Sequence, residues 1–289
     1  MSRILYYLIM KPASLLPLPL LYVLSDFLYL LLYRLIGYRK KVVRTNLKNS
    51  FPDKSEAERL SIERKFYRHL FDLMVEAIRN FSIPKAELLR RCPVTNPEIF
   101  EYYKQLNKKI IIVAGHYNNW ELAAIACGLQ IIYPTMGIYS PFSDKFMNER
   151  AIASRGRFGM ELVSKKLVKD YFERNKNRLS AVMFGADQSP SNAAKAYWTT
   201  FLNQDTAVMF GTEKYAVEYD YAVVYGHVQK LRRGYYQMTF IPLEDHPTTA
   251  PYGSISEKHT RMLEQHILEA PEYWLWTHKR WKRKREVNK

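Results

Sequence analysis

Two short apolar runs, each followed at once by polar residues, mark the centre of the predicted fold. Residues 110–114 (IIIVA) are uninterrupted, apolar and largely β-branched, which is typical of a strand buried on both faces. Residues 179–185 (LSAVMFG) have the same character. His116 and Asp187 stand just past these two strands, and open α/β sheets bind their ligands at the carboxyl ends of strands. The pattern therefore predicts one crevice that holds both side chains.

Helical and strand-like patterns alternate along the rest of the chain. Residues 55–79 carry apolar side chains at helical spacing, residues 118–126 begin with a capping asparagine, and residues 144–157 are also expected to be helical. IIYPTMGIYS predicts a further strand, and YAVVYGHV and YYQMTFIPL predict an antiparallel pair at the sheet edge. A loop and a helix are expected between residues 196 and 220. The alternation predicts an α/β fold with a mostly parallel central sheet flanked by helices.

The most apolar stretch is residues 15–36, but it does not predict a simple membrane span. A spanning helix needs about 20 apolar residues, and a charged residue at mid-bilayer costs about 2.5 to 3.5 kcal/mol. Pro19, Asp26 and Arg34 interrupt this run, and no small-residue cleavage site of a signal peptide follows it. We expect a helix from near Pro19 that lies in or on the inner leaflet, the alternative being a buried core helix. The basic residues at the headgroups would be Arg39, Lys40 and Lys41.

Composition narrows the classes of partner. The 289 residues are 47% hydrophobic, enough for a substantial core, and 44 Lys and Arg against 28 Asp and Glu give a net charge of +16. Anionic partners are therefore expected: phospholipid headgroups, an acidic carrier protein, phosphorylated glycolipids or nucleic acid. Nucleic acid is disfavoured because no binding motif for it is recognisable. The two cysteines, Cys92 and Cys127, argue against a disulfide framework or a zinc cluster and indicate the reducing cytosol.

His116 and Glu121 flank the turn that follows the first strand. In one continuous helix, residues five apart would point about 140° away from each other, whereas a strand, turn and helix allow them to meet. A carboxylate beside an imidazole fixes its tautomer and raises its basicity, as a general base requires. The alternatives are that Glu121 only closes a capping box and that His116 is a satisfied turn histidine.

The string GHYNNWE resembles the first motif of the lipid A biosynthesis acyltransferases, a branch of the lysophospholipid acyltransferase superfamily. The resemblance implies that His116 is the base that activates an acceptor hydroxyl and that Glu121 orients it. Asn118 stands where many members have glycine, which leaves the acceptor open. HKRWK near the C-terminus resembles a second motif of the family, and YWTTFLNQDT is most similar to members from Bacteroidota.

Further site residues follow from the same resemblance. Arg155, with Arg157 as the second choice, matches an arginine that precedes the family's aspartate, and Asp187 and Gln188 match its DQ motif. These four residues are expected to bind substrate. Four aromatic residues are expected along the acyl-chain path, unless they are ordinary core: Tyr197, Trp198, Phe201 and Phe210. The C-terminal residues that suit a membrane interface are Trp274, Trp276, Arg280 and Trp281.

The expected function is transfer of a fatty acyl chain from an acyl thioester to a hydroxyl of a lipid A precursor. Acyl carrier protein is the favoured donor and coenzyme A the other, with neither cofactor nor metal. The expected fold is glycerolipid acyltransferase-like, with residues 1–45 as the membrane-associated helix and basic flank and 46–289 as the acyltransferase domain, in a monomer at the cytoplasmic face of the inner membrane. Two alternatives remain: an O-acyltransferase for a lysophospholipid or aminoacyl lipid, and a non-catalytic basic adaptor on the membrane surface.

Overall fold

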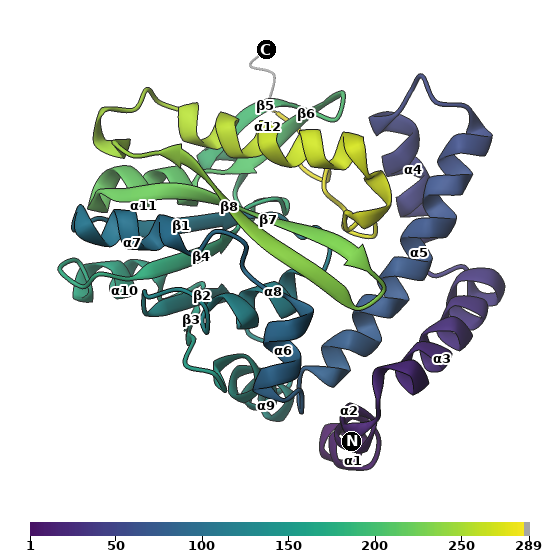
Figure 1. The fold of residues 1–289 in the computed structure, drawn as a ribbon. Helices are drawn as coiled ribbons and strands as arrows, with labels where there is room; N and C mark the ends of the chain where they lie inside the picture. Colours follow the sequence, from purple (N-terminus) through teal and green to yellow (C-terminus); the bar gives the residue numbers. More distant parts are fainter. Residues whose placement is uncertain (286–289) are drawn as a thin grey trace.

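The computed structural model describes residues 1–285, which are built around a six-stranded sheet (Figure 1). The strands follow the order β3-β2-β4-β1-β7-β8, and only the pairing of β7 with β8 is antiparallel. Their bounds are β1 Lys109–Ala114, β2 Thr135–Tyr139, β3 Glu161–Ser164, β4 Ala181–Gly185, β7 Tyr221–Arg232 and β8 Tyr235–Glu244. The prediction of a mostly parallel α/β sheet with an antiparallel edge is confirmed.

Strand β1 is central because both of its faces are buried. Ile111 and Val113 belong to one hydrophobic core, whereas Ile110 and Ile112 belong to the other. Helices cover both faces of the sheet (Figure 1). Those that contribute to the first core include α4 (Lys40–Ser50), α5 (Glu56–Arg79), α10 (Val168–Arg174), α11 (Gly211–Tyr219) and α12 (Ser254–Glu269). Those of the second core include α6 (Lys85–Arg91), α7 (Glu98–Gln105) and α8 (Trp120–Cys127). This two-sided burial explains why the strand sequence is apolar throughout rather than alternating.

Local capping explains where two of the predicted helices begin. The Ser55 hydroxyl accepts a hydrogen bond from the Glu58 backbone N–H, and the Glu58 carboxylate accepts one from the Ser55 backbone N–H, so that α5 starts with a capping box. Asp144 caps α9 (Lys145–Gly156) by accepting from the Met147 backbone. Both boundaries agree with the sequence pattern.

Residues 196–209 differ from the prediction, because they form an antiparallel hairpin where a loop was expected. Strand β5 (Ala196–Phe201) pairs with β6 (Gln204–Met209) through a two-residue turn. The turn residues, Leu202 and Asn203, have φ angles of 49° and 62°. Positive φ at both positions is the requirement of a type I′ turn, and leucine rarely adopts it, so the sequence carried no recognisable turn signal.

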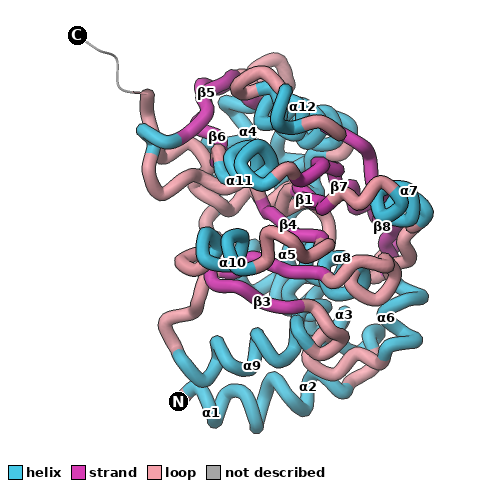
Figure 2. The backbone as a smooth tube through the Cα atoms, turned by 90° about the vertical axis from the view of Figure 1, so that its left-hand side faces the viewer, coloured by secondary structure: helices cyan, strands magenta, loops and turns pink. Residues whose placement is uncertain are grey.

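The N-terminal helices lie along the outside of α5 (Figure 1). They are α1 (Ser2–Ile4), η1 (Leu5–Met10), α2 (Lys11–Leu15), α3 (Leu18–Leu28) and η2 (Tyr29–Ile36). Figure 2 shows α1 beside α9, at the opposite end of the molecule from the hairpin of β5 and β6. The helix Leu18–Ile36 is long and apolar enough to cross a membrane, and 22% of it is buried, which disagrees with a buried core helix. Asp26, expected to interrupt an apolar helix, forms a 2.7 Å ion pair with Arg233.

Candidate active site

His116 and Asp187 meet because their strands are neighbours. Strands β1 and β4 pair in parallel up to Ala114 and Gly185, so the residues that follow leave the same edge of the sheet. Asp187 Oδ1 lies 2.6 Å from His116 Nδ1, and Asp187 Oδ2 accepts a 2.9 Å hydrogen bond from the His116 backbone N–H. The crevice predicted from the two strand ends is therefore present.

Three donors around Asp187 fix the tautomer of the imidazole. Oδ2 accepts from the His116 backbone and from Trp274 Nε1, which is 2.8 Å away. Oδ1 is left to accept the proton of His116 Nδ1, and a carboxylate can only accept. In the neutral ring the lone pair is then on Nε2, 3.2 Å from Gln188 Nε2. This is the arrangement of a base that is ready to take a proton.

The same contacts set the charge of the pair. Burial by itself would lower the pKa of His116, but the charge of Asp187 and its hydrogen bond outweigh burial and raise that pKa above its ordinary value. Burial opposes the ionisation of Asp187, yet His116 and Trp274 hold the pKa of Asp187 far below its usual range. Asp187 is therefore an anion at neutral pH, and His116 is a stronger base than free histidine.

Glu121 does not orient the imidazole, which corrects that expectation. Its carboxylate forms a two-point ion pair with Arg155 on α9, with distances of 2.8 Å to Nε and 2.5 Å to Nη2. Helix α8 starts at Trp120, so Glu121 is in its first turn, directed toward α9, while Asp187 occupies the histidine nitrogen. Because Asn119 caps α8 by accepting from the Leu122 backbone N–H, Glu121 does not close a capping box either.

Asn118 has a φ of 53°, a conformation that asparagine and glycine adopt most readily.

An apolar cavity of about 540 Å³ lies beside this turn. Such a volume is within the range of about 300 to 1,000 Å³ that is typical of ligand sites. Trp120, Glu121 and Arg155 line it, and the Trp120 ring meets the His116 ring edge to face at 5.1 Å between centroids. Other wall residues come from the N-terminal helices, α5, α9 and the C-terminal segment, among them Met10, Leu73, Met74, Phe81, Met147 and Leu275. The cavity therefore reaches from the N-terminal helices to Trp120, beside the His116–Asp187 pair.

The aromatic residues expected along an acyl-chain path do not line this cavity. Tyr197 and Phe210 pack on Tyr252, whereas Trp198 donates from Nε1 to the Ala193 carbonyl. Phe201 is buried against Trp274 and Trp281. Tyr197, Trp198 and Phe201 all lie on β5, and the unexpected hairpin of β5 and β6 carries them away from the cavity wall.

The C-terminal motif is part of the core, which corrects the expected membrane interface. Trp274 and Trp276 are only 2% and 0% exposed. Tyr117 and Trp274 form an antiparallel bridge, so the C-terminal segment runs directly along the motif turn. Trp281 donates from Nε1 to Thr206, and Arg280 is buried. By contrast, Arg39 and Lys41 are exposed and Lys40 is half-buried, so the N-terminal part of that prediction stays open.

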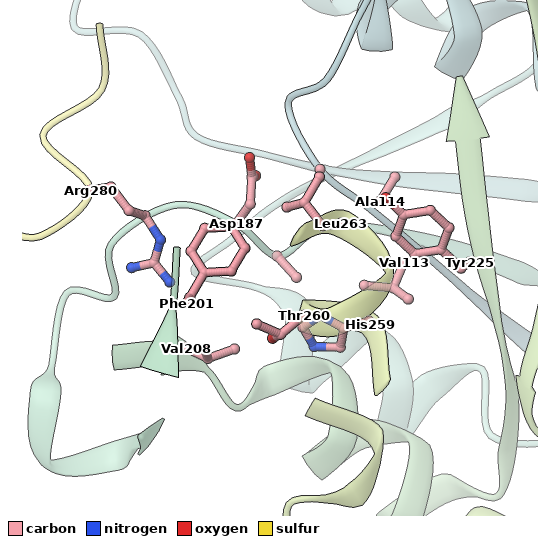
Figure 3. A pocket seen from close by; sticks show the side chains of 12 residues that line it. Val113, Ala114, Asp187, Phe201, Val208, Tyr225, His259, Thr260, Leu263 and Arg280 are labelled. Atoms are coloured by element: carbon pink, nitrogen blue, oxygen red, sulfur yellow. The ribbon is translucent and has the colours of Figure 1, made fainter. Parts of the chain in front are cut away.

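Behind Asp187 lies a second, much smaller cavity, shown in Figure 3. Its volume is about 10 Å³, close to the room that one water molecule needs. Arg280 and His259 both line it, and Arg280 Nε and His259 Nε2 have no hydrogen-bond partner among residues 1–285. The two polar groups and the cavity form a site that suits a buried water.

The two candidate arginines have different surroundings. Arg155 reaches the cavity, and its Nη1 makes no hydrogen bond with any of residues 1–285. Arg157 donates to the backbone carbonyls of Asn80 and Ile83, beyond the end of α5. Arg155 is therefore positioned to contact a ligand, whereas Arg157 binds the backbone. Sequence reasoning missed the role of Trp274 as a donor to Asp187, although the aromatic motif near the C-terminus was the available signal.

Comparison with known proteins gives a consistent result along the whole chain. The sequence pattern of the family described as bacterial lipid A biosynthesis acyltransferase matches residues 2–283. The lipid A biosynthesis lauroyltransferase of Escherichia coli K12 is 24% identical over 272 residues, which are 94% of this chain and 88% of the relative. The lipid A biosynthesis palmitoleoyltransferase of the same strain is 23% identical over 84% of this chain and 79% of its own length. The lipid A biosynthesis acyltransferase of Shigella flexneri gives the same values.

Proposed function

Because the chain belongs to the bacterial lipid A biosynthesis acyltransferase family, we propose that it transfers a fatty acyl chain from acyl carrier protein to a hydroxyl of a lipid A precursor. The activity is that of an acyltransferase, and the donor and the site of action are the proposed parts. The observation that carries the proposal is the His116–Asp187 pair beside a large apolar cavity whose wall includes a cation, Arg155.

His116 acts as the base in the proposed reaction. The acceptor hydroxyl displaces Gln188 from Nε2 and gives its proton to that nitrogen, while Asp187 stabilises the imidazolium that forms. The alkoxide oxygen attacks the thioester carbonyl, and the C–S bond breaks as the tetrahedral intermediate collapses. The departing thiolate takes the proton back from His116, so the products are an ester and a free thiol, and the enzyme returns to its starting state.

Arg155 supplies the positive charge for this step. Glu121 binds two of its guanidinium nitrogens and thereby fixes its plane, which leaves Nη1 directed to a substrate oxygen. The oxyanion of the tetrahedral intermediate or a phosphate of the acceptor is the group of matching charge. Glu121 therefore acts through Arg155 and not through the imidazole.

The large cavity provides room for a hydrocarbon chain. Its walls are mostly apolar, and each CH₂ group that leaves water contributes about 0.8 kcal/mol. The net charge of +16 favours an acidic carrier protein as the donor, because opposite charges accelerate encounter. Coenzyme A remains the alternative thioester.

The proposed site of action is the cytoplasmic face of the inner membrane. The N-terminal helices expose large apolar side chains, including Leu20, Val23, Phe27 and Leu30, which an aqueous environment disfavours. Arg39 and Lys41 follow this surface in the chain and would lie near anionic headgroups. A lipid acceptor could then enter the cavity from the leaflet, because Met10 belongs to both the N-terminal helices and the cavity wall.

Acyl transfer from a radiolabelled acyl carrier to a lipid A precursor in detergent tests the proposal. We expect transfer by the wild type, and a loss of at least about 10³-fold in His116→Ala, since that change removes the base. Transfer to a lysophospholipid or aminoacyl lipid instead would support the alternative acceptor class. Binding to vesicles without turnover on any donor would support a membrane adaptor and refute the enzymatic proposal.

A further inference from the structure

A fully buried carboxylate next to the motif turn has no part in the mechanism above. Glu76 lies on α5 and is 0% exposed. Its Oε1 accepts a 2.8 Å hydrogen bond from Tyr22, and its Oε2 accepts from Asn119 at 2.5 Å and from Tyr236 at 3.0 Å. Arg91 Nη2 is 3.4 Å from Oε2. Three hydrogen-bond donors and one guanidinium therefore converge on one buried carboxyl group, whose pKa is raised by burial.

These donors come from four separate parts of the fold. Tyr22 lies on the N-terminal helix α3, Arg91 on α6 and Tyr236 on β8. Asn119 precedes α8 and belongs to the motif turn. Glu76 therefore ties the turn simultaneously to the sheet edge and to the apolar N-terminal helix. Because an unpaired buried donor costs about 1 to 3 kcal/mol, each of these contacts is expected to hold its element in place.

Asn119 passes this restraint on to the site. Its Oδ1 accepts from the Leu122 backbone and caps α8, while its Nδ2 donates to Glu76. The next residue, Trp120, contacts the His116 ring, and Glu121 after it holds Arg155. A shift of Asn119 would therefore move both the cavity wall beside the base and the carboxylate that fixes the guanidinium.

We propose that Glu76 is a positioning residue for acyl transfer, which sets the place of the Asn119–Glu121 turn relative to His116 and to helix α3. The inference rests on the proposed function for its kinetic consequence, whereas the restraint on the turn is a property of the fold alone. Through Tyr22, the seating of the N-terminal helix contributes to the geometry of the turn.

Glu63 offers a matched control, because it shares most features of Glu76 except the contact with the turn. It lies on the same helix, is 1% exposed, accepts from Tyr33 of the N-terminal helices at 3.1 Å and pairs with Arg44 at 2.9 Å. If the buried acids only stabilise the packing of the N-terminal helices on α5, replacing either one should have the same consequence.

The experiment compares Glu76→Gln with Glu63→Gln in the full chain. In one orientation of Glu76→Gln the amide N–H₂ faces Asn119 and Tyr236, so Asn119 loses its acceptor. In the other the N–H₂ faces Tyr22, whose hydroxyl can accept, and Asn119 then donates to an amide oxygen instead of a carboxylate. Both orientations hold the turn less firmly than Glu76 does. We expect kcat to fall about 10- to 100-fold, because small displacements of reacting groups have effects of this size. KM for the lipid should change less than about threefold, since α5 and the N-terminal helices still form most of the cavity. The acid limb of the pH profile should keep its midpoint, because the His116–Asp187 pair is untouched.

Two further measurements separate positioning from general destabilisation. Hydrogen exchange of peptides that cover residues 117–126 should accelerate in Glu76→Gln and stay unchanged in Glu63→Gln, even if both variants melt earlier. Asn119→Ser keeps a capping oxygen but no longer donates to Glu76, so it should reproduce the loss in kcat and add little to it in the double variant.

Equal losses of kcat in Glu76→Gln and Glu63→Gln, or unchanged exchange in the turn, would overturn the inference. Failure of the wild type to transfer an acyl chain would instead refute the proposed function. The exchange comparison would still report on the role of Glu76 in that case.

Discussion

The replacement of Asp187 by asparagine should reverse the tautomer of His116, the proposed base. Oδ2 accepts from both the His116 backbone and Trp274, so the amide oxygen of an asparagine must take that position. The amide N–H₂ then faces Nδ1, which is 2.6 Å from the carboxylate in the wild type, and Nδ1 must accept instead of donate. The ring proton moves to Nε2, and the nitrogen beside Gln188 can no longer take a proton from the acceptor.

The expected size of this effect is large. A general base in the wrong tautomer loses about 10³- to 10⁴-fold in kcat in a comparable arrangement of histidine and aspartate, which corresponds to about 4 to 5.5 kcal/mol of barrier. A second effect concerns the pH dependence of the rate. Without the negative charge that raises the pKa of His116, the acid limb of kcat/KM should move to lower pH, toward or below the ordinary histidine value of about 6.5.

Initial rates of acyl transfer, measured in detergent from mildly acidic to mildly alkaline pH, test both effects. Trp274→Phe is the control, because it removes one donor to Asp187 but leaves the charge and the contact with Nδ1, and we expect a loss of no more than about tenfold. If Asp187→Asn kept more than a tenth of the wild-type rate while Glu121→Gln shifted the acid limb, Glu121 would be the partner of the imidazole in solution and the reasoning would be refuted.

Four other expectations follow from the same structure. Gly185→Ala would place a Cβ 3.0 Å from His116 Cε1, so kcat should fall at least about tenfold while circular dichroism stays unchanged; a fully active variant would contradict the closeness of β4 to the ring. Asn118→Ala should lower the free energy of unfolding by about 1 to 2 kcal/mol more than Asn118→Gly in urea titrations, because both lose the same side-chain hydrogen bond but only alanine is strained at positive φ. Because folding raises the pKa of His116, protonated His116 stabilises the folded protein fully below about pH 6.5, and this contribution is lost as pH rises through the raised pKa. The difference in melting temperature between the wild type and His116→Gln should therefore shrink as pH rises through that range. A difference that does not depend on pH would argue against the raised pKa. Replacing Val23, Phe27 and Leu30, which are 67%, 57% and 56% exposed, by serine should weaken sedimentation with anionic vesicles without lowering the melting temperature, whereas matched binding would place the membrane contact elsewhere.

The sequence predicted the sheet and the position of His116 well, because apolar runs report directly on strands that are buried on both faces. It did not predict which acid pairs with the histidine. Glu121 is close to His116 in the chain, whereas Asp187 follows His116 by 71 residues and reaches it only through the parallel pairing of β1 with β4. Composition reports the residue types of a segment but not its tertiary partner. Trp274 therefore matched a membrane interface in sequence, although its bridge with Tyr117 places it in the core.

The bridge between Tyr117 and Trp274 also has a consequence for the order of events during synthesis. The apolar helices are translated before strand β1 and His116, whereas Trp274, the donor to Asp187, is translated 87 residues after Asp187. Domains generally fold as units during translation, so Asp187 lacks one of its three donors until Trp274 has emerged. In a ribosome-bound chain the apolar helices are therefore complete well before the segment that packs along the motif turn. We expect products truncated before Trp274 to keep the exposed apolar helices and to lack this part of the core.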